Sequence, residues 1–125
     1  GVYEVQGLPV TPYMVPQDCG MHMQTKWLEI VRKTSLDNTD RGGRSSRLKI
    51  TAEEGKDFAF SCLPYTAQEL ENAMHHEELP PARRTVVSIL GAVRGVGGIN
   101  SWGADVEDIY HISGEQDISY GFWIE

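Results

Sequence analysis

The stretch RLKITAEEGKDFAFSC, residues 47–62, contains two short runs with a period of two. In the first run, residues 47–51, Leu48 and Ile50 fall on one face and charged or polar side chains on the other. In the second run, residues 58–62, large and small side chains alternate in the same way. This periodicity is typical of a β-strand whose two faces meet different surroundings. The stretch therefore predicts two β-strands.

Three further runs extend this pattern along the chain. Residues 24–31 (QTKWLEIV) and 85–93 (TVVSILGAV) are apolar on both faces, which is typical of interior strands covered on two sides. Toward the end of the chain, every second residue is apolar at Ile118, Tyr120, Phe122 and Ile124. We therefore expect several strands joined by turns, arranged as a β-sandwich.

One segment has helical spacing instead. Thr66 and Glu69 stand in the positions of a capping box, in which each side chain bonds the other residue's backbone N–H. Leu70, Ala73 and Met74 follow at helical spacing, and a pair of prolines at 80–81 ends the segment. This predicts a helix of about two to three turns. The fold class is thus all-β with one short helix, and 125 residues with 40% hydrophobic side chains suit a single domain over residues 1–125.

Charge and hydropathy argue against two classes of partner. The net charge is −7, with 18 acidic and 11 basic residues, so a nucleic-acid partner is not expected. The densest basic stretch, residues 41–49, is rich in Gly and Ser and favours a solvated loop entering a strand over a phosphate site. No run approaches the ~18 apolar residues of a membrane-spanning helix, so no membrane partner is expected. The chain starts at Gly1 rather than Met and looks trimmed, which leaves the compartment open between cytoplasm and periplasm.

Potential metal ligands and thiols favour structural roles. Cys19 and Cys62 can pair, but free and partly buried thiols are favoured in a chain of this length. Neighbouring strand residues point to opposite faces, so the segment 21–23 (MHM) cannot converge on one ion. The segment 75–78 (HHEE) is interpreted as a solvated helix end. We therefore expect neither a metal site nor a cofactor within this chain.

The most unusual segment is 94–103, RGVGGINSWG. Its glycines, Gly95, Gly97 and Gly98, allow backbone conformations with positive φ and close approach to another surface. Asn100 precedes Trp102, and an exposed indole in a loop is a suitable platform for the apolar face of a sugar ring. The residues alone equally allow an indole folded back as a loop anchor. A nucleotide site is disfavoured, because the GxxxxGK[ST] pattern is absent.

Carboxylates near this segment do not suggest catalysis. Glycoside hydrolysis requires two carboxyl groups about 5–10 Å apart across a sugar site. Asp105, Glu107 and Asp108 follow Trp102, but a charged rim on a turn is the favoured interpretation. No nucleophile-elbow motif of the GxSxG kind is present. The chain is therefore predicted to lack a catalytic residue set of its own.

Three segments, in this order and spacing, resemble the C-terminal domain of LacZ-type β-galactosidases, glycoside hydrolase family 2. Residues 11–20 (TPYMVPQDCG), followed by 25–28 (TKWL), are similar to the family's TPY-x-x-P-x-E/D-x-G…TRWL. Residues 60–70 (FSCLPYTAQEL) are similar to FSALPYT-x-EEL, and the match runs on through Ala73, His75, Glu78 and Leu79. Residues 95–103 (GVGGINSWG) are similar to G-x-GG-x-DSWGP. The resemblance covers nearly the whole chain.

The resemblance implies a fold and a role. The chain is expected to be the C-terminal segment of a galactose-mutarotase-like β-supersandwich, within a parent enzyme that hydrolyses terminal β-D-galactosides. The catalytic pair is expected in an upstream TIM barrel, and Trp102 is expected to contact the sugar beyond the galactosyl position, with Asn100 as a weaker contact. The implied partners are the remaining domains, a galactoside or other carbohydrate, and a second copy in a homo-oligomer. Mg²⁺ and Na⁺ are implied for the parent enzyme.

Departures from the family pattern bear on the substrate. Asn100 stands where the family often has aspartate, Ala104 replaces proline, and Lys26 replaces arginine. Two other interpretations are therefore kept. One is a carbohydrate-binding or scaffolding module of an enzyme with another β-glycoside substrate, and the other is a stand-alone aldose epimerase. A half-sandwich is further expected to expose an apolar sheet face and to self-associate when isolated.

Overall fold

The structure is a computed structural model that describes residues 1–32, 46–95, 97, 100 and 102–125. These residues form six β-strands in two sheets, one short α-helix and two 3-10 helices, so the all-β prediction is confirmed. The described chain divides into two compact units, one of Gly1–Met23 with Ala59–Leu90 and one of Gln24–Phe58 with Gly91–Glu125. Each unit is described by itself. The supersandwich and the single domain over residues 1–125 stay predictions.

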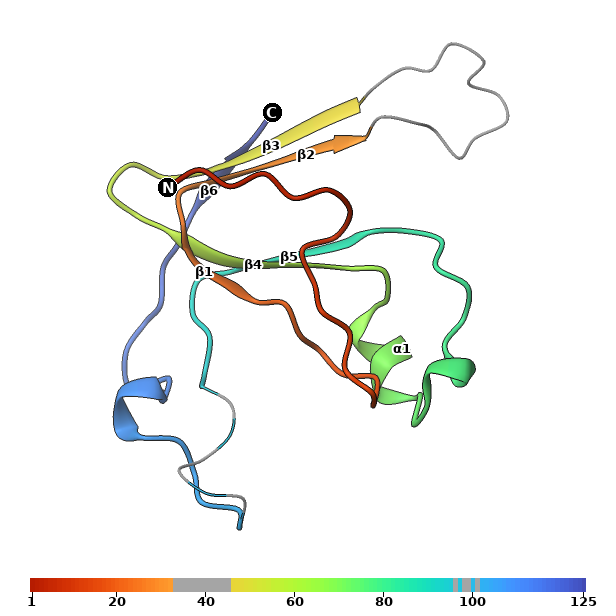
Figure 1. Ribbon diagram of the computed structural model, residues 1–125. Coiled ribbons are helices and arrows are strands. Elements are labelled where there is room, and N and C mark those ends of the chain that lie inside the picture. Colours follow the sequence, from red (N-terminus) through yellow and green to blue (C-terminus); the bar gives the residue numbers. More distant parts are fainter. Residues whose placement is uncertain (33–45, 96, 98–99, 101) are drawn as a thin grey trace. The chain divides into compact units, whose positions relative to one another are not determined.

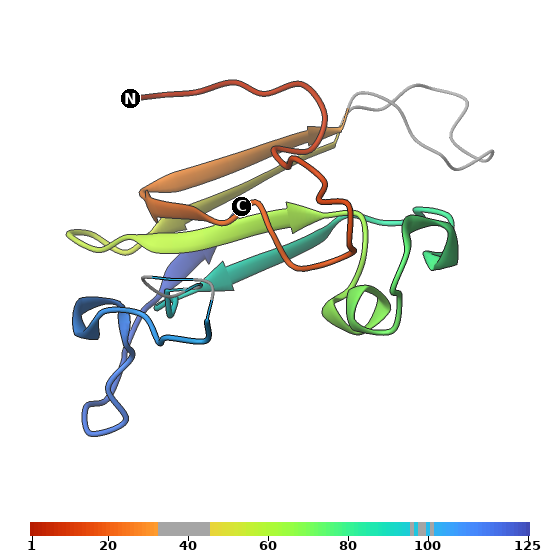
Figure 2. The same cartoon turned by 60° about the horizontal axis from the view of Figure 1, so that its bottom comes forward.

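The first unit is built on a sheet with strand order β1-β4-β5 (Figure 1). β1 is His22–Thr25, β4 is Phe58–Leu63 and β5 is Val86–Leu90. Every residue of β4 is buried, and β4 and β5 run antiparallel side by side (Figure 2), with Phe60 opposite Ile89. The interior strand of the described sheet is therefore β4. The prediction of an interior strand at 85–93 was wrong, because β5 lies at the edge of these three strands and ends where a bend begins at Gly91.

The helix α1, Ala67–Glu71, begins with the predicted capping box. Thr66 Oγ1 accepts a hydrogen bond from the Glu69 amide at 3.2 Å, and the Glu69 carboxylate accepts one from the Thr66 amide at 2.8 Å. The helix is shorter than predicted, because the Met74 amide donates to the Glu78 carboxylate at 2.7 Å and a separate 3-10 helix follows at His76–Glu78. Leu70 anchors α1 by its burial.

The contacts of His22 and the state of the two cysteines indicate structural roles. The His22 ring stacks on Phe60 with a centroid distance of 4.8 Å, and its Nε2 lies 3.0 Å from the Pro9 carbonyl oxygen. The 21–23 segment therefore serves packing, as predicted. Cys19 and Cys62 are free thiols, which confirms the favoured interpretation. Burial raises the pKa of both thiols, and the Asp18 carboxylate adds to this effect at Cys19.

The second unit contains a sheet with strand order β2-β3-β6. β2 is Trp27–Arg32, β3 is Ser46–Ala52 and β6 is Phe122–Ile124. Both neighbours of β3 run antiparallel to it, with Leu28 and Ile124 opposite Ile50. Ile50 is only 3% exposed, and the buried Phe58 ring contacts Phe122 edge-on at a centroid distance of 6.4 Å. Apolar side chains of this register therefore form the core of the unit.

Two strand predictions differ from this sheet. The single strand expected over 24–31 is divided into β1 and β2, because the chain bends at Lys26 between them. β2 lies at the edge of the described sheet and leaves Trp27 and Val31 exposed, so its interpretation as an interior strand was wrong. Of the alternating run 118–124, only β6 is a strand.

Large apolar side chains remain exposed on the β2-β3-β6 sheet. Trp27 and Trp123 both lie opposite Thr51 in the register, so they project from the same face, and they are 43% and 67% exposed. Ile124 on the other face is also exposed. This agrees with the expected open sheet, while self-association stays a prediction. No helix within the described ranges has the length and apolar character needed to cross a membrane.

Candidate functional site

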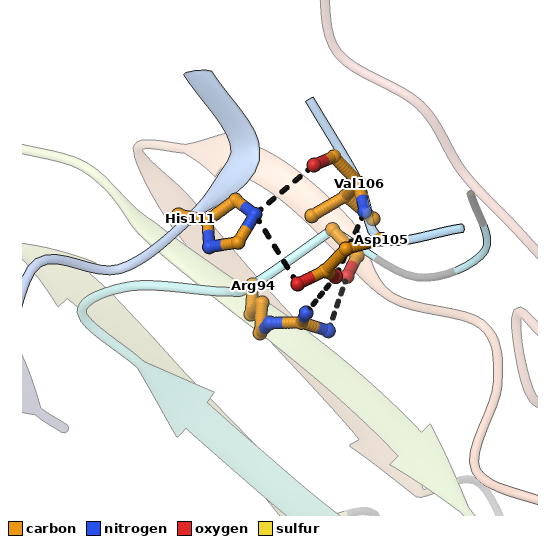
Figure 3. A network of polar contacts seen from close by, with 5 residues as sticks. Arg94, Asp105, Val106 and His111 are labelled. Carbon is orange, nitrogen blue, oxygen red and sulfur yellow. Dashed lines mark hydrogen bonds and ion pairs between the residues drawn. The ribbon is translucent and has the colours of Figure 1, made fainter. Parts of the chain in front are cut away.

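Arg94 and Asp105 join the two ends of the segment that carries the predicted site residues. The Arg94 guanidinium donates to one oxygen of the Asp105 carboxylate, which also accepts from the Val106 amide at 2.8 Å. His111 Nε2 lies 3.6 Å from the other Asp105 oxygen and 3.0 Å from the Val106 carbonyl oxygen. Figure 3 shows the carboxylate between the guanidinium and the imidazole. The polar network thus ties residues 94, 105–106 and 111 together.

This network lowers the pKa of the Asp105 carboxyl group. The Val106 amide, the Arg94 guanidinium and the His111 ring lower the pKa of Asp105 below its ordinary value of 3.8, against a smaller opposing effect of desolvation. A carboxyl group with a lowered pKa is anionic at neutral pH and cannot act as a general acid there. Asp105 is thus an ion-pair partner of Arg94, while the interpretation of the acidic cluster as a charged rim stays a prediction.

At two of the predicted loop glycines, glycine is needed for a different structural reason. The Gly95 amide donates to the Tyr110 carbonyl at 2.9 Å, and a Cβ added at Gly95 would lie 2.7 Å from the Tyr110 Cβ. Gly95 thus allows close approach of the chain. Gly97 has open space around it but takes φ +75°, where a residue with a side chain is strained. Gly98 lies outside the described residues, as do residues 41–45 of the predicted basic loop.

Trp102 presents its indole to solvent. The side chain is 91% exposed, and its backbone N–H donates to Asn100 Oδ1 at 2.9 Å. An asparagine oxygen that bonds the amide two residues ahead forms a local turn. Trp102 is therefore not a packed loop anchor within the described structure. Asn100 holds the turn on which the indole is displayed.

A cavity of about 490 Å³ lies beside this turn. Its polar side is formed by Arg94, Asn100 and Asp105, and the rest of its lining is Gly97, Gly103, Ala104 and Val106. The cavity is an open depression of the surface, and the described residues that line it do not include Trp102. The structure thus brings Asn100 and Asp105 to one depression, which they share with Gly103, the residue after Trp102. The sequence did not single out the roles of Arg94 and His111, although a charged residue at each end of a glycine-rich loop is a usable signal for Arg94.

Comparisons with known proteins identify the family. The model of the family described as beta galactosidase small chain matches residues 1–124. The chain is 59% identical over 124 residues to the beta-galactosidase small subunit of Latilactobacillus sakei, which covers 99% of this chain and 39% of that protein.

Longer proteins are also similar. Beta-galactosidase BgaC of Bifidobacterium adolescentis is 39% identical over 108 residues, or 86% of this chain and 9% of that protein. The beta-galactosidase of Streptococcus thermophilus is 35% identical over 114 residues, or 91% of this chain and 10% of that protein. The chain thus spans only part of the relatives that it matches. No solved structure matches it. On these grounds the chain belongs to the beta-galactosidase small chain family.

Proposed function

We propose that the chain is a non-catalytic component of a β-galactosidase, an enzyme that hydrolyses terminal β-D-galactosides. Family membership and the names of the similar proteins support this role. The chain corresponds to only 9% or 10% of the longer relatives, so most of the enzyme lies outside it. We therefore assign the catalytic carboxylates to other parts of the complete enzyme.

Within that enzyme, Trp102 is the contact for the sugar on the leaving-group side. The observation that carries this assignment is the 91% exposed indole, displayed on a turn whose Asn100 lines an open depression of about 490 Å³. The C–H face of a sugar ring packs on an aromatic face, while nearby polar groups bond its hydroxyls. The cavity offers such a group in Asn100, whose amide N–H groups can donate.

The partners of the chain are the remaining parts of the β-galactosidase. Trp27, Trp123 and Ile124 are exposed on the β2-β3-β6 sheet, and apolar side chains in such numbers favour burial by another surface. Among the described residues, no three His, Cys, Asp or Glu side chains gather to hold a metal ion. The Mg²⁺ and Na⁺ that the family resemblance implies for the complete enzyme stay a proposal.

The test is Trp102→Ala in the complete enzyme, that is, this chain assembled with all other parts. Loss of an aromatic anchor typically costs about 2 kcal/mol or more, so we expect about thirtyfold weaker binding of a free acceptor sugar and a raised KM for a disaccharide. The unfolding free energy should change by less than about 1 kcal/mol, because no core side chain is lost.

The matched control is Met74→Ala, which removes another apolar side chain, 72% exposed, in the other compact unit. This variant should retain the acceptor affinity of the unmodified enzyme. Unchanged acceptor affinity in Trp102→Ala would show that the indole is not a sugar contact. An equal loss in both variants would contradict the assignment as well.

A further inference from the structure

We propose that Arg94, Asp105 and His111 form a clasp that positions Trp102 for the acceptor sugar, with Arg94 and Asp105 as positioning residues. This inference rests on the proposed function for its effect on sugar binding. The effect of the clasp on the loop is argued from the described contacts alone. The clasp is defined by the ion pair Arg94–Asp105 and by the contacts of His111 to Asp105 and Val106.

The position of the ion pair in the chain is the first argument. Arg94 and Asp105 are eleven residues apart, and Trp102 lies between them. Joining the two ends of a loop removes conformations that the free loop would populate. An indole held in place binds a ligand with a smaller loss of side-chain and loop freedom than one on a loose loop. The pair is therefore placed at the base of the loop that carries Trp102, and it acts on the indole through that loop.

A second set of contacts attaches the same loop base to the following segment. The Gly95 amide donates to the Tyr110 carbonyl, and the Tyr110 amide donates to the Glu107 carbonyl, both at 2.9 Å. These backbone bonds hold the 3-10 helix η2, Asp108–Tyr110, against the start of the loop and bring His111 to Asp105. Because these bonds do not depend on the ion pair, its removal should loosen the loop without unfolding the unit.

Direct contact with the sugar is the competing role, since Arg94 and Asp105 also line the cavity. The two roles predict different results when the charged residues at positions 94 and 105 are swapped. A positioning ion pair can reform when the two residues are swapped, whereas a donor or acceptor for a sugar hydroxyl is lost at both positions. The coupling between the two substitutions therefore separates the two roles.

The experiment compares Arg94→Asp, Asp105→Arg and the double variant that carries both substitutions, all in the complete enzyme. Acceptor-sugar affinity and KM and kcat for a disaccharide are measured, together with backbone hydrogen exchange of residues 94–111 by mass spectrometry. An exposed pair contributes at most about a fivefold effect, so each single variant should bind acceptor up to about fivefold more weakly and exchange correspondingly faster. KM should rise with little change in kcat.

The charge-swapped variant should bind acceptor more tightly, and exchange more slowly, than either single variant. Arg84→Leu is the matched control, because it removes an Arg–Glu pair of 3.0 Å at Glu69, in the other compact unit. It should leave both readouts of the loop unchanged. The inference is overturned if Arg94→Asp leaves hydrogen exchange at residues 94–111 unchanged, or if the swapped variant binds acceptor no better than the two single variants.

These readouts separate the clasp from the proposed function. If Trp102→Ala does not alter acceptor affinity, the sugar-contact role of Trp102 fails. Faster exchange in the single variants, restored in the swapped variant, would still support the clasp in that case. If acceptor affinity depends on Trp102 but loop exchange does not depend on Arg94, only the clasp fails.

Discussion

At Gly95 the backbone passes so close to Tyr110 that a side chain has no room. A Cβ there would lie 2.7 Å from the Tyr110 Cβ, and overpacking of this kind typically costs about 1–3 kcal/mol. We therefore expect Gly95→Ala to lower the free energy of unfolding and to speed hydrogen exchange at Tyr110. Gly114→Ala is the control, because a Cβ at Gly114 meets nothing within 4 Å. Equal effects of the two substitutions would contradict the close-approach role.

The residue types in the sequence predicted part of the candidate site. The rest became visible only from the side-chain contacts in the structure. Trp102 and Asn100 stood out because an indole after a glycine-rich segment is unusual, and the structure shows that indole exposed. Arg94 and His111 did not stand out, because their contacts with Asp105 depend on how the chain turns back after the loop. Such a return path is not encoded in a local pattern.

At the scale of an element, helix α1 depends on its capping box. Thr66→Ala should lower the free energy of unfolding by about 1 kcal/mol, because the Glu69 amide loses its acceptor. Glu71→Gln is the control, since Glu71 is exposed and lies outside the box. Denaturant unfolding of both variants measures the difference, and a Thr66→Ala variant as stable as Glu71→Gln would contradict the capping role.

The same box gives α1 a pH dependence. The Thr66 amide and, to a smaller extent, Arg84 lower the pKa of Glu69 below its ordinary value of 4.5. A carboxyl group whose pKa is lowered by folding stabilises the fold above its unfolded pKa, and this contribution is lost as the pH falls through the folded value. The stability difference between the unmodified chain and a Glu69→Gln variant should therefore shrink in acid below pH 4.5. A difference that stays constant with pH would show that the charge of Glu69 is not involved.

Local patterns predicted the elements better than their places in the sheets. The run 47–51 lies within β3 and the capping box begins α1, because both depend on neighbouring residues. The burial of all of β4 and the edge positions of β2 and β5 depend on which strands pair, and apolar residues on both faces did not distinguish these strands. The bend at Lys26 between β1 and β2 was not visible either, because no Gly or Pro marks it in the sequence.

At the scale of the whole molecule, the chain should not hydrolyse a chromogenic β-galactoside when purified alone. Retaining and inverting glycosidases both need a pair of carboxyl groups across the sugar. Asp105, three residues after Trp102, is engaged in an ion pair with Arg94. The measurement is release of chromophore by the pure chain, with the complete enzyme as the positive control. Turnover by the pure chain that a substitution within its 125 residues abolishes would contradict this prediction.

The central claim is that this chain contributes a sugar contact to an active site that it does not contain. The most direct measurement is a crystal structure of the complete enzyme with an acceptor sugar bound. The account predicts the sugar ring on the Trp102 indole, with carbon atoms within about 4 Å of the ring. A bound acceptor sugar with the Trp102 indole away from it, buried against protein or facing solvent, would contradict the account.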